Sequence, residues 1–89
     1  MATRESVDHC LEQCQQAIDF AAAQYEESAR QEHNNAGDFN EAQLMLENAY
    51  NELDKLLLSA NEQQREMLHR KRFQIQQLQN QMILGIRYQ

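Results

Sequence analysis

The amino-acid sequence has no proline, no tryptophan and only two glycines, Gly37 and Gly85, among its 89 residues. Sandwiches, barrels and βαβ units need glycine and proline at their many turns and β-branched residues in their strands. This chain has a single valine and a single threonine, whereas it has 14 glutamines and is rich in leucine, alanine and glutamate. Because these residues favour helices, the sequence predicts one all-α domain over residues 1–89.

Long apolar runs are missing as well. No uninterrupted apolar run approaches the roughly 20 residues that a membrane-spanning helix needs. The first residues include an arginine and a glutamate and lead into further polar positions, so no secretion signal is expected. Cys10 and Cys14 are too few for a disulfide scaffold, and a bridge between them within one helix would have poor geometry. The sequence therefore predicts a cytoplasmic protein with reduced cysteines.

Negative charge dominates the chain, but it is unevenly distributed. The formal net charge is −6, with three cationic and twelve acidic residues in 1–60, and five cationic and two acidic residues in 61–89. The negative total argues against general nucleic-acid binding, because phosphate contacts need a cationic surface. The basic C-terminal segment either pairs with the acidic remainder, within one chain or between two, or meets an external anionic partner.

A first helix is expected over about residues 4–33. Thr3 is a suitable N-cap, and Glu5 stands in the first turn, where a carboxylate suits the helix dipole. Two asparagines and Gly37 then indicate a turn over 34–38. Between these limits, apolar residues recur at alternating spacings of four and three, as on the buried face of an amphipathic helix: Val7, Leu11, Cys14, Ile18, Ala21 and Tyr25.

The second segment, about residues 39–85, is expected to form one long helix. Asp38 and Glu41 have the spacing of a capping box, and no glycine or proline interrupts the segment before its last residue. At about 100° per residue, eight apolar positions fall within about 40° of one direction. These positions are Leu46, Tyr50, Leu53, Leu57, Leu68, Ile75, Met82 and Ile86.

The continuous helix predicts an antiparallel helical hairpin that dimerises into a helical bundle. A second helix of about 47 residues spans roughly 70 Å, whereas the first spans roughly 45 Å. An uncovered apolar stripe at the end of the longer helix would require a partner. The residues left without cover would be Leu78, Met82, Ile83, Leu84 and Ile86.

The alternative is a break near Ser59–Asn61, which gives a three-helix bundle that needs no second copy. In the stretch 59–65, Ala60 is the only apolar residue. Ser59 and Glu62 also have the spacing of a capping box, with which a new helix would begin.

Few residues are candidates for chemistry. Cys10 and Cys14, beside His9, supply half of the ligands of a zinc site, but packed, reduced core thiols are the preferred explanation. There is no glycine-rich phosphate loop, no His-x-x-x-His pair and no acid and base that helical geometry forces together. The sequence therefore predicts no enzymatic activity, no cofactor and no bound metal.

A candidate interaction surface combines basic and apolar residues of the last third of the chain: Arg65, Arg70, Lys71, Arg72, Ile75, Leu78, Met82 and Ile86. The leading hypothesis is a non-catalytic protein–protein interaction or regulatory module, a homodimer that binds a protein partner by helix packing. The alternative is a peripheral binder of an anionic surface, nucleic acid or membrane, through the run from Arg65 to Arg72 and the apolar C-terminal tail. Neither nucleic acid nor membrane is expected as the main partner.

Three stretches of the sequence resemble a known family: SARQEH at 28–33, the segment 51–66 with SANEQQRE at its end, and QLQNQMI at 77–83. They are similar to short YtzC-like proteins of Bacillus-type bacteria, and the similarity covers most of the chain. The resemblance implies a small cytosolic bacterial protein and supplies no catalytic or binding residues. The resemblance also includes the polar residues 59–66. One explanation of these residues is a polar layer that fixes the register of the helices, and the other is a turn.

Overall fold

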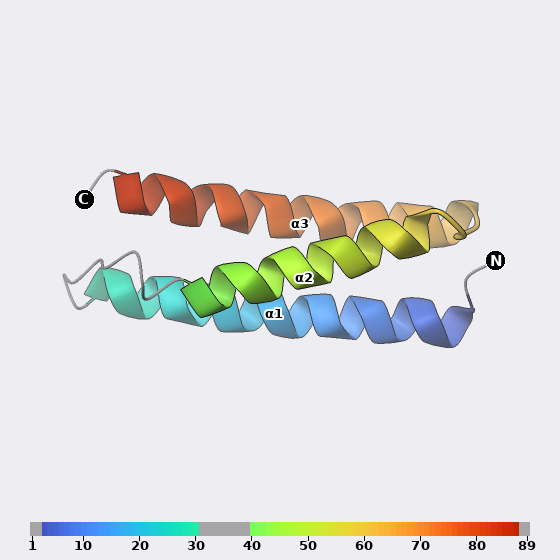
Figure 1. Ribbon diagram of the computed structural model, residues 1–89, viewed down its shortest axis with the longest axis horizontal. Coiled ribbons are helices and arrows are strands. Elements are labelled where there is room, and N and C mark those ends of the chain that lie inside the picture. The colour runs from blue at the N-terminus through green and yellow to red at the C-terminus, as the bar shows by residue number, and fades with distance from the viewer. Residues whose placement is uncertain (1–2, 31–39, 88–89) are drawn as a thin grey trace.

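The computed structural model describes residues 3–30 and 40–87, and these residues form three helices and no strand (Figure 1). The helices are α1 (Arg4–Arg30), α2 (Asn40–Leu57) and α3 (Glu62–Arg87). α1 and α3 run in the same direction, α2 runs opposite to both, and every helix packs against the other two. The predicted all-α fold is confirmed.

α1 begins where the sequence predicts. The Thr3 Oγ1 accepts a hydrogen bond of 3.0 Å from the backbone N–H of Ser6, and Glu5 stands in the first turn. An oxygen at this position satisfies one of the amide groups that the start of a helix leaves unpaired. The predicted turn over 34–38 and the capping box that begins at Asp38 lie outside the described residues.

The continuous second helix is not formed, and the alternative prediction of a turn near Ser59–Asn61 is confirmed. α2 ends at Leu57 and α3 begins at Glu62, and the intervening residues 58–61 lie outside any helix. The physical reason is the polar stretch 59–65, in which Ala60 is the only apolar residue. A helix continued through it would bury almost nothing, whereas a chain that folds back packs the apolar stripe of α3 against α1 and α2.

The capping box at this turn begins two residues later than predicted, at Asn61 rather than Ser59. The Asn61 Oδ1 accepts a hydrogen bond of 2.8 Å from the backbone N–H of Gln64. In return, the Gln64 Oε1 accepts one of 3.0 Å from the backbone N–H of Asn61. Asparagine is as good an N-cap as serine, and glutamine replaces glutamate in the reciprocal role.

The core lies along the axis of the bundle, where all three helices meet. On α1 the buried face is displaced from the predicted one, because Cys10 and Ala17 are buried while Leu11 and Ile18 are only partly covered. α1 faces both other helices along this line, and small side chains let their backbones approach. The buried residues are Val7, Cys10, Cys14, Ala17, Ala21, Ala42, Leu46, Ala49, Leu53, Leu57, Leu68, Ile75, Leu78 and Met82.

The overhang that predicted a dimer is not present in the described residues. Leu78 and Met82 are buried in the bundle of their own chain, and Ile83 and Leu84 are about half exposed. The side chain of Ile86 lies outside the described residues. The molecule extends 46 Å along its long axis, because α3 lies back along α1 and α2. None of the described helices is long and apolar enough to cross a membrane.

Candidate interaction surface

The end of α2 and the first half of α3 lie side by side, because only four residues, 58–61, connect the two helices (Figure 1). Arg65 of α3 forms a polar contact with the end of α2 at this junction. Its Nε donates a hydrogen bond of 3.3 Å to the backbone oxygen of Leu57. The last carbonyl groups of a helix have no partner within the helix and carry partial negative charge, so a cation is well placed there.

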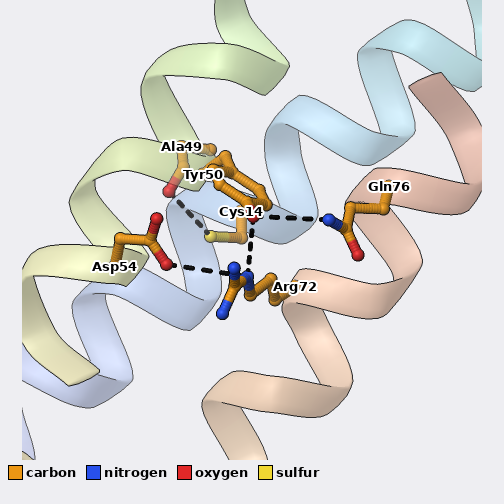
Figure 2. Close-up of polar contacts among 6 residues, drawn as sticks. All are labelled: Cys14, Ala49, Tyr50, Asp54, Arg72 and Gln76. Carbon is orange, nitrogen blue, oxygen red and sulfur yellow. Dashed lines mark hydrogen bonds and ion pairs between the residues drawn. The ribbon is translucent and has the colours of Figure 1, made fainter.

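A second polar contact joins the same two helices one to two turns further from the junction. The Arg72 Nε donates a hydrogen bond of 2.8 Å to the Tyr50 hydroxyl and lies 3.6 Å from Asp54 Oδ1. The Gln76 Nε2 donates to the same hydroxyl at 3.3 Å (Figure 2). The Arg72 guanidinium also lies 5.0 Å from the centre of the Tyr50 ring. These contacts fix the position of one cation at the edge of the core.

The hydrogen bond to Tyr50 raises the pKa of Arg72, and the neighbouring Asp54 carboxylate acts in the same direction. Arginine is already charged at all ordinary pH values, so these contacts fix the position of the Arg72 guanidinium and do not change its charge. Arg72 stays charged, and its guanidinium is held facing α2 by two side chains, Tyr50 and Asp54.

Between these two contacts the surface is hollowed. The hollow has a volume of about 530 Å³, and we call it the α2–α3 hollow. Three cationic side chains and one carboxylate line it, in a chain whose net charge is −6. Its most exposed apolar side chain is Leu58, which is 85% exposed at the start of the turn. The lining residues are Asp54, Lys55, Leu57, Leu58, Arg65, His69 and Arg72.

The predicted basic run is divided between different sides of α3. Arg65 and Arg72 are seven residues apart, so they share one side and line the hollow. The Lys71 Nζ instead donates a hydrogen bond of 2.6 Å to Gln15 Oε1 on α1. Arg70 pairs with the exposed Glu66 of its own helix at 3.0 Å. Consecutive residues of a helix point about 100° apart, so a run of cations in the sequence does not form one patch.

The apolar half of the predicted surface is not on the surface. Ile75, Leu78 and Met82 are buried in the core. Because α3 folds back, these side chains are covered by helices of the same chain and do not join the cations on one face. Ile86 was also predicted here, and its side chain lies outside the described residues.

Four lining residues of the hollow were missed by sequence reasoning: Asp54, Lys55, Leu57 and Leu58, whereas His69 lies within the predicted run from Arg65 to Arg72. The alternative prediction of a three-helix bundle could have identified these residues. If the chain turns near residue 60, the last turn of α2 lies opposite the first turns of α3, which places 54–58 beside 65–72. The preferred continuous helix kept these two groups far apart.

Cys10 and Cys14 are both buried free thiols. The Cys14 Sγ–H donates to the backbone oxygen of Ala49 at 3.8 Å (Figure 2). Burial raises the pKa of Cys14 to about 12, with the neighbouring Cys10 adding to the shift, and burial also raises the pKa of Cys10. Both thiols are therefore protonated at neutral pH, which does not favour nucleophilic attack or metal binding. The described residues contain no group of three or more His, Cys, Asp or Glu side chains that could hold a metal ion.

Comparison with known proteins gives one family and one relative. The sequence model of the family described as "Protein of unknown function (DUF2524)" matches residues 1–84. The Uncharacterized protein YtzC of Bacillus subtilis (strain 168) is 55% identical over 84 residues, which cover 94% of this chain and 93% of that protein. No solved structure matches the chain.

Proposed function

The chain belongs to that bacterial family of proteins of unknown function, and we propose that it is a non-catalytic interaction module that docks an acidic segment of a partner protein. The site of docking is the α2–α3 hollow. The observation that carries the proposal is the combination, in one hollow, of the exposed Leu58 with three cationic side chains. We place the protein in the cytoplasm, where the free thiols of Cys10 and Cys14 remain reduced.

The chemistry of the partner follows from the lining. An apolar contact surrounded by charge is the usual arrangement of a protein–protein interface, with affinity from the apolar centre and orientation from the rim. Lys55, Arg65 and Arg72 outnumber Asp54, so the matching segment carries carboxylates on either side of a large apolar side chain. A short amphipathic helix or an extended peptide of that composition fits the proposal.

The opposite face of the bundle supports a different protein as the partner of the hollow, rather than a closed pair of identical chains joined through the hollow. Glu5, Asp8, Glu12 and Asp19 are exposed on α1 at spacings of three, four and seven, which places them along one side of the helix. The hollow lies between α2 and α3. Contact between the acidic side of one copy and the hollow of the next would be head-to-tail, which does not close into a dimer.

An anionic polymer or membrane is a weaker candidate for this surface. Lys71 and Arg70 lie on other sides of α3 and have partners within the chain, so the basic run does not present one patch of cations to phosphates. The acidic faces of α1 and α2 would also repel a polyanion.

The test is affinity capture from a native lysate with matched surface variants of the full-length protein. Leu58→Ser/Lys55→Gln removes an exposed apolar side chain and an exposed cation from the hollow. Phe73→Ser/Arg70→Gln removes the same two kinds of group from residues that do not line the hollow. We expect the same partner bands with the wild type and the Phe73/Arg70 variant, and their loss with the Leu58/Lys55 variant.

Equal capture by all three proteins would overturn the assignment of the hollow. Circular dichroism of each variant confirms that the helices are intact before capture is compared. Nuclease treatment and lipid vesicles distinguish the anionic-surface alternative. Capture that disappears after nuclease treatment, or that vesicles compete away, would contradict a protein partner.

A further inference from the structure

α2 and α3 share one helical register, although a turn separates them. If α2 continued through residues 58–61 at about 100° per residue, all the buried residues of both helices would lie within about 60° of Leu46. These residues are Ala42, Leu46, Ala49, Leu53, Leu57, Leu68, Ile75, Leu78 and Met82. A straightened α2–α3 helix would therefore present both halves of the core on the same face.

The turn that separates them contains nothing that prevents straightening. Residues 58–61 are Leu, Ser, Ala and Asn, with neither glycine nor proline. The backbone N–H groups of Leu58 and Ser59 already bond to the carbonyls of Lys55 and Leu56, at 3.3 and 3.1 Å. In a continuous helix these N–H groups would bond one residue further back, so the backbone loses no hydrogen bond. What the turn provides within one chain is the exposed capping box of Asn61 and Gln64 and the Arg65 hydrogen bond to the Leu57 carbonyl.

We infer that the groove between α1 and α2, which α3 of the same chain fills in the monomer, also accepts α3 of a second copy. In this dimer the turn straightens in both chains, and the chains exchange α3. Each α3 makes the same contacts as before, including Lys71 with Gln15 and Arg72 with Tyr50, but with α1 and α2 of the other copy. The two long helices cross at a two-fold axis near residue 60, so the assembly closes. This inference does not depend on the α2–α3 hollow.

The monomer and the exchanged dimer bury the same residues. Their relative populations therefore depend on the conformation of residues 58–61 and on the protein concentration. Variants of this segment are therefore expected to change the oligomeric state without changing the core. Asn61→Ala removes an acceptor that is used only in the monomer. Each monomer loses a capping bond equivalent to about a fivefold effect, and two monomers form each dimer, so the dimerisation constant should rise roughly 25-fold.

Glu62→Pro has the opposite effect. Residue 62 is the first of α3, a position at which proline is compatible with the start of a helix. In a straight helix the same proline would lie in the interior and break it. Glu62→Ala is the matched control, because it removes the same carboxylate and leaves both forms available.

The experiment refolds each protein at millimolar concentration and measures the mass by light scattering after size exclusion. For the wild type we expect the 10.5 kDa monomer together with a species of twice that mass. The heavier species should be enriched in Asn61→Ala, retained in Glu62→Ala and absent in Glu62→Pro. Only the 10.5 kDa species in both the wild type and Asn61→Ala would overturn the inference, as would equal dimerisation of the Glu62→Pro and Glu62→Ala proteins.

A cross-link identifies the exchange itself. In the isolated dimer of Gln15→Cys/Lys71→Cys, a short bismaleimide joins the two new thiols, while Cys10 and Cys14 are buried. Exchange predicts links between chains and a dimer band on a denaturing gel. Links confined to single chains would show that the dimer forms through outer surfaces, and would contradict the exchange of α3.

Discussion

Cys14 has no exposed surface, and its thiol reaches across from α1 to the backbone of α2 at Ala49. The residue therefore acts as a small apolar side chain with a weak hydrogen-bond donor. The thiolate form of Cys14 would be a charge buried away from water, which explains why the pKa of this thiol is raised. A reactive thiol has an exposed sulfur, whereas the Cys14 sulfur is buried.

The stability of the protein is expected to fall above pH 9 because of this thiol. The pKa of Cys14 is about 12 in the folded chain and 9.0 without the fold. Between these values the unfolded chain has lost the proton while the folded chain keeps it, so rising pH favours unfolding. The slope from this group is at most about 1.4 kcal/mol per pH unit. Urea unfolding of the wild type and Cys14→Ala at pH 8 and pH 10.5 measures it.

The Cys14→Ala variant should lose less stability than the wild type between the two pH values, although it starts from a lower value because of the cavity. Tyrosines and lysines also titrate in this range, and they affect both proteins alike. An identical loss in both would contradict the role assigned to the thiol.

At the scale of the elements, α1 packs through small residues. Ala17 and Ala21 are buried on α1, and Ala42 and Ala49 are buried on α2. Small side chains on both surfaces allow the helix axes to approach, and little space remains for a larger residue. The amphipathic pattern alone favoured the larger Leu11 and Ile18, which lie at the edges of this contact.

Enlarging this contact should destabilise the bundle. Ala21→Leu places three additional carbon atoms at a position with no exposed surface, and we expect a cost of about 1–3 kcal/mol. Ala23→Leu makes the same change at an exposed position of the same helix, where the effect should be within about 0.5 kcal/mol. Urea unfolding followed by circular dichroism compares the two. Similar costs at both positions would disprove the close approach of α1 to its neighbours.

At the scale of the whole molecule, α3 folds back along α1 and α2. This arrangement brings the acidic and basic parts of the chain together. Arg72 lies beside Asp54 of α2, and Lys71 donates a hydrogen bond to Gln15, an uncharged residue of α1. Exposed ion pairs contribute little to stability, so the apolar face of α3 is the main force that holds the helix in place. Met82 is fully buried near its end, while the next residue, Ile83, is 47% exposed.

Substitutions of the adjacent residues Met82 and Ile83 measure how much the packing of α3 against α1 and α2 contributes to the free energy of unfolding. Met82→Ala should cost about 2–5 kcal/mol, because it leaves a cavity among three helices. Ile83→Ala should cost roughly 1 kcal/mol or less, because much of that side chain remains in water. Chemical denaturation monitored by circular dichroism and by tyrosine fluorescence gives both values. A smaller cost for Met82→Ala than for Ile83→Ala would contradict the packing of α3 in the described fold.

The sequence by itself determined the class of fold, the start of α1 and most of the residues that are buried. Each follows from local chemistry: helix formers without glycine or proline, a threonine before a first turn, and apolar residues at helical spacing. The stripe from Leu46 to Met82 was identified correctly, and the capping pattern near residue 60 was recognised within two residues.

Only the tertiary structure decided whether that stripe belongs to one helix or to two, because its residues align equally well in both cases. Local pattern cannot distinguish burial against the same chain from burial against another, since the apolar side chains are covered either way. The fold-back in turn assigned Ile75 and Met82 to the core and brought Leu58 beside Arg65 and His69. The absence of glycine and proline between α2 and α3, which predicts a helix, leaves the turn dependent on the capping box and on the Arg65 contact with Leu57.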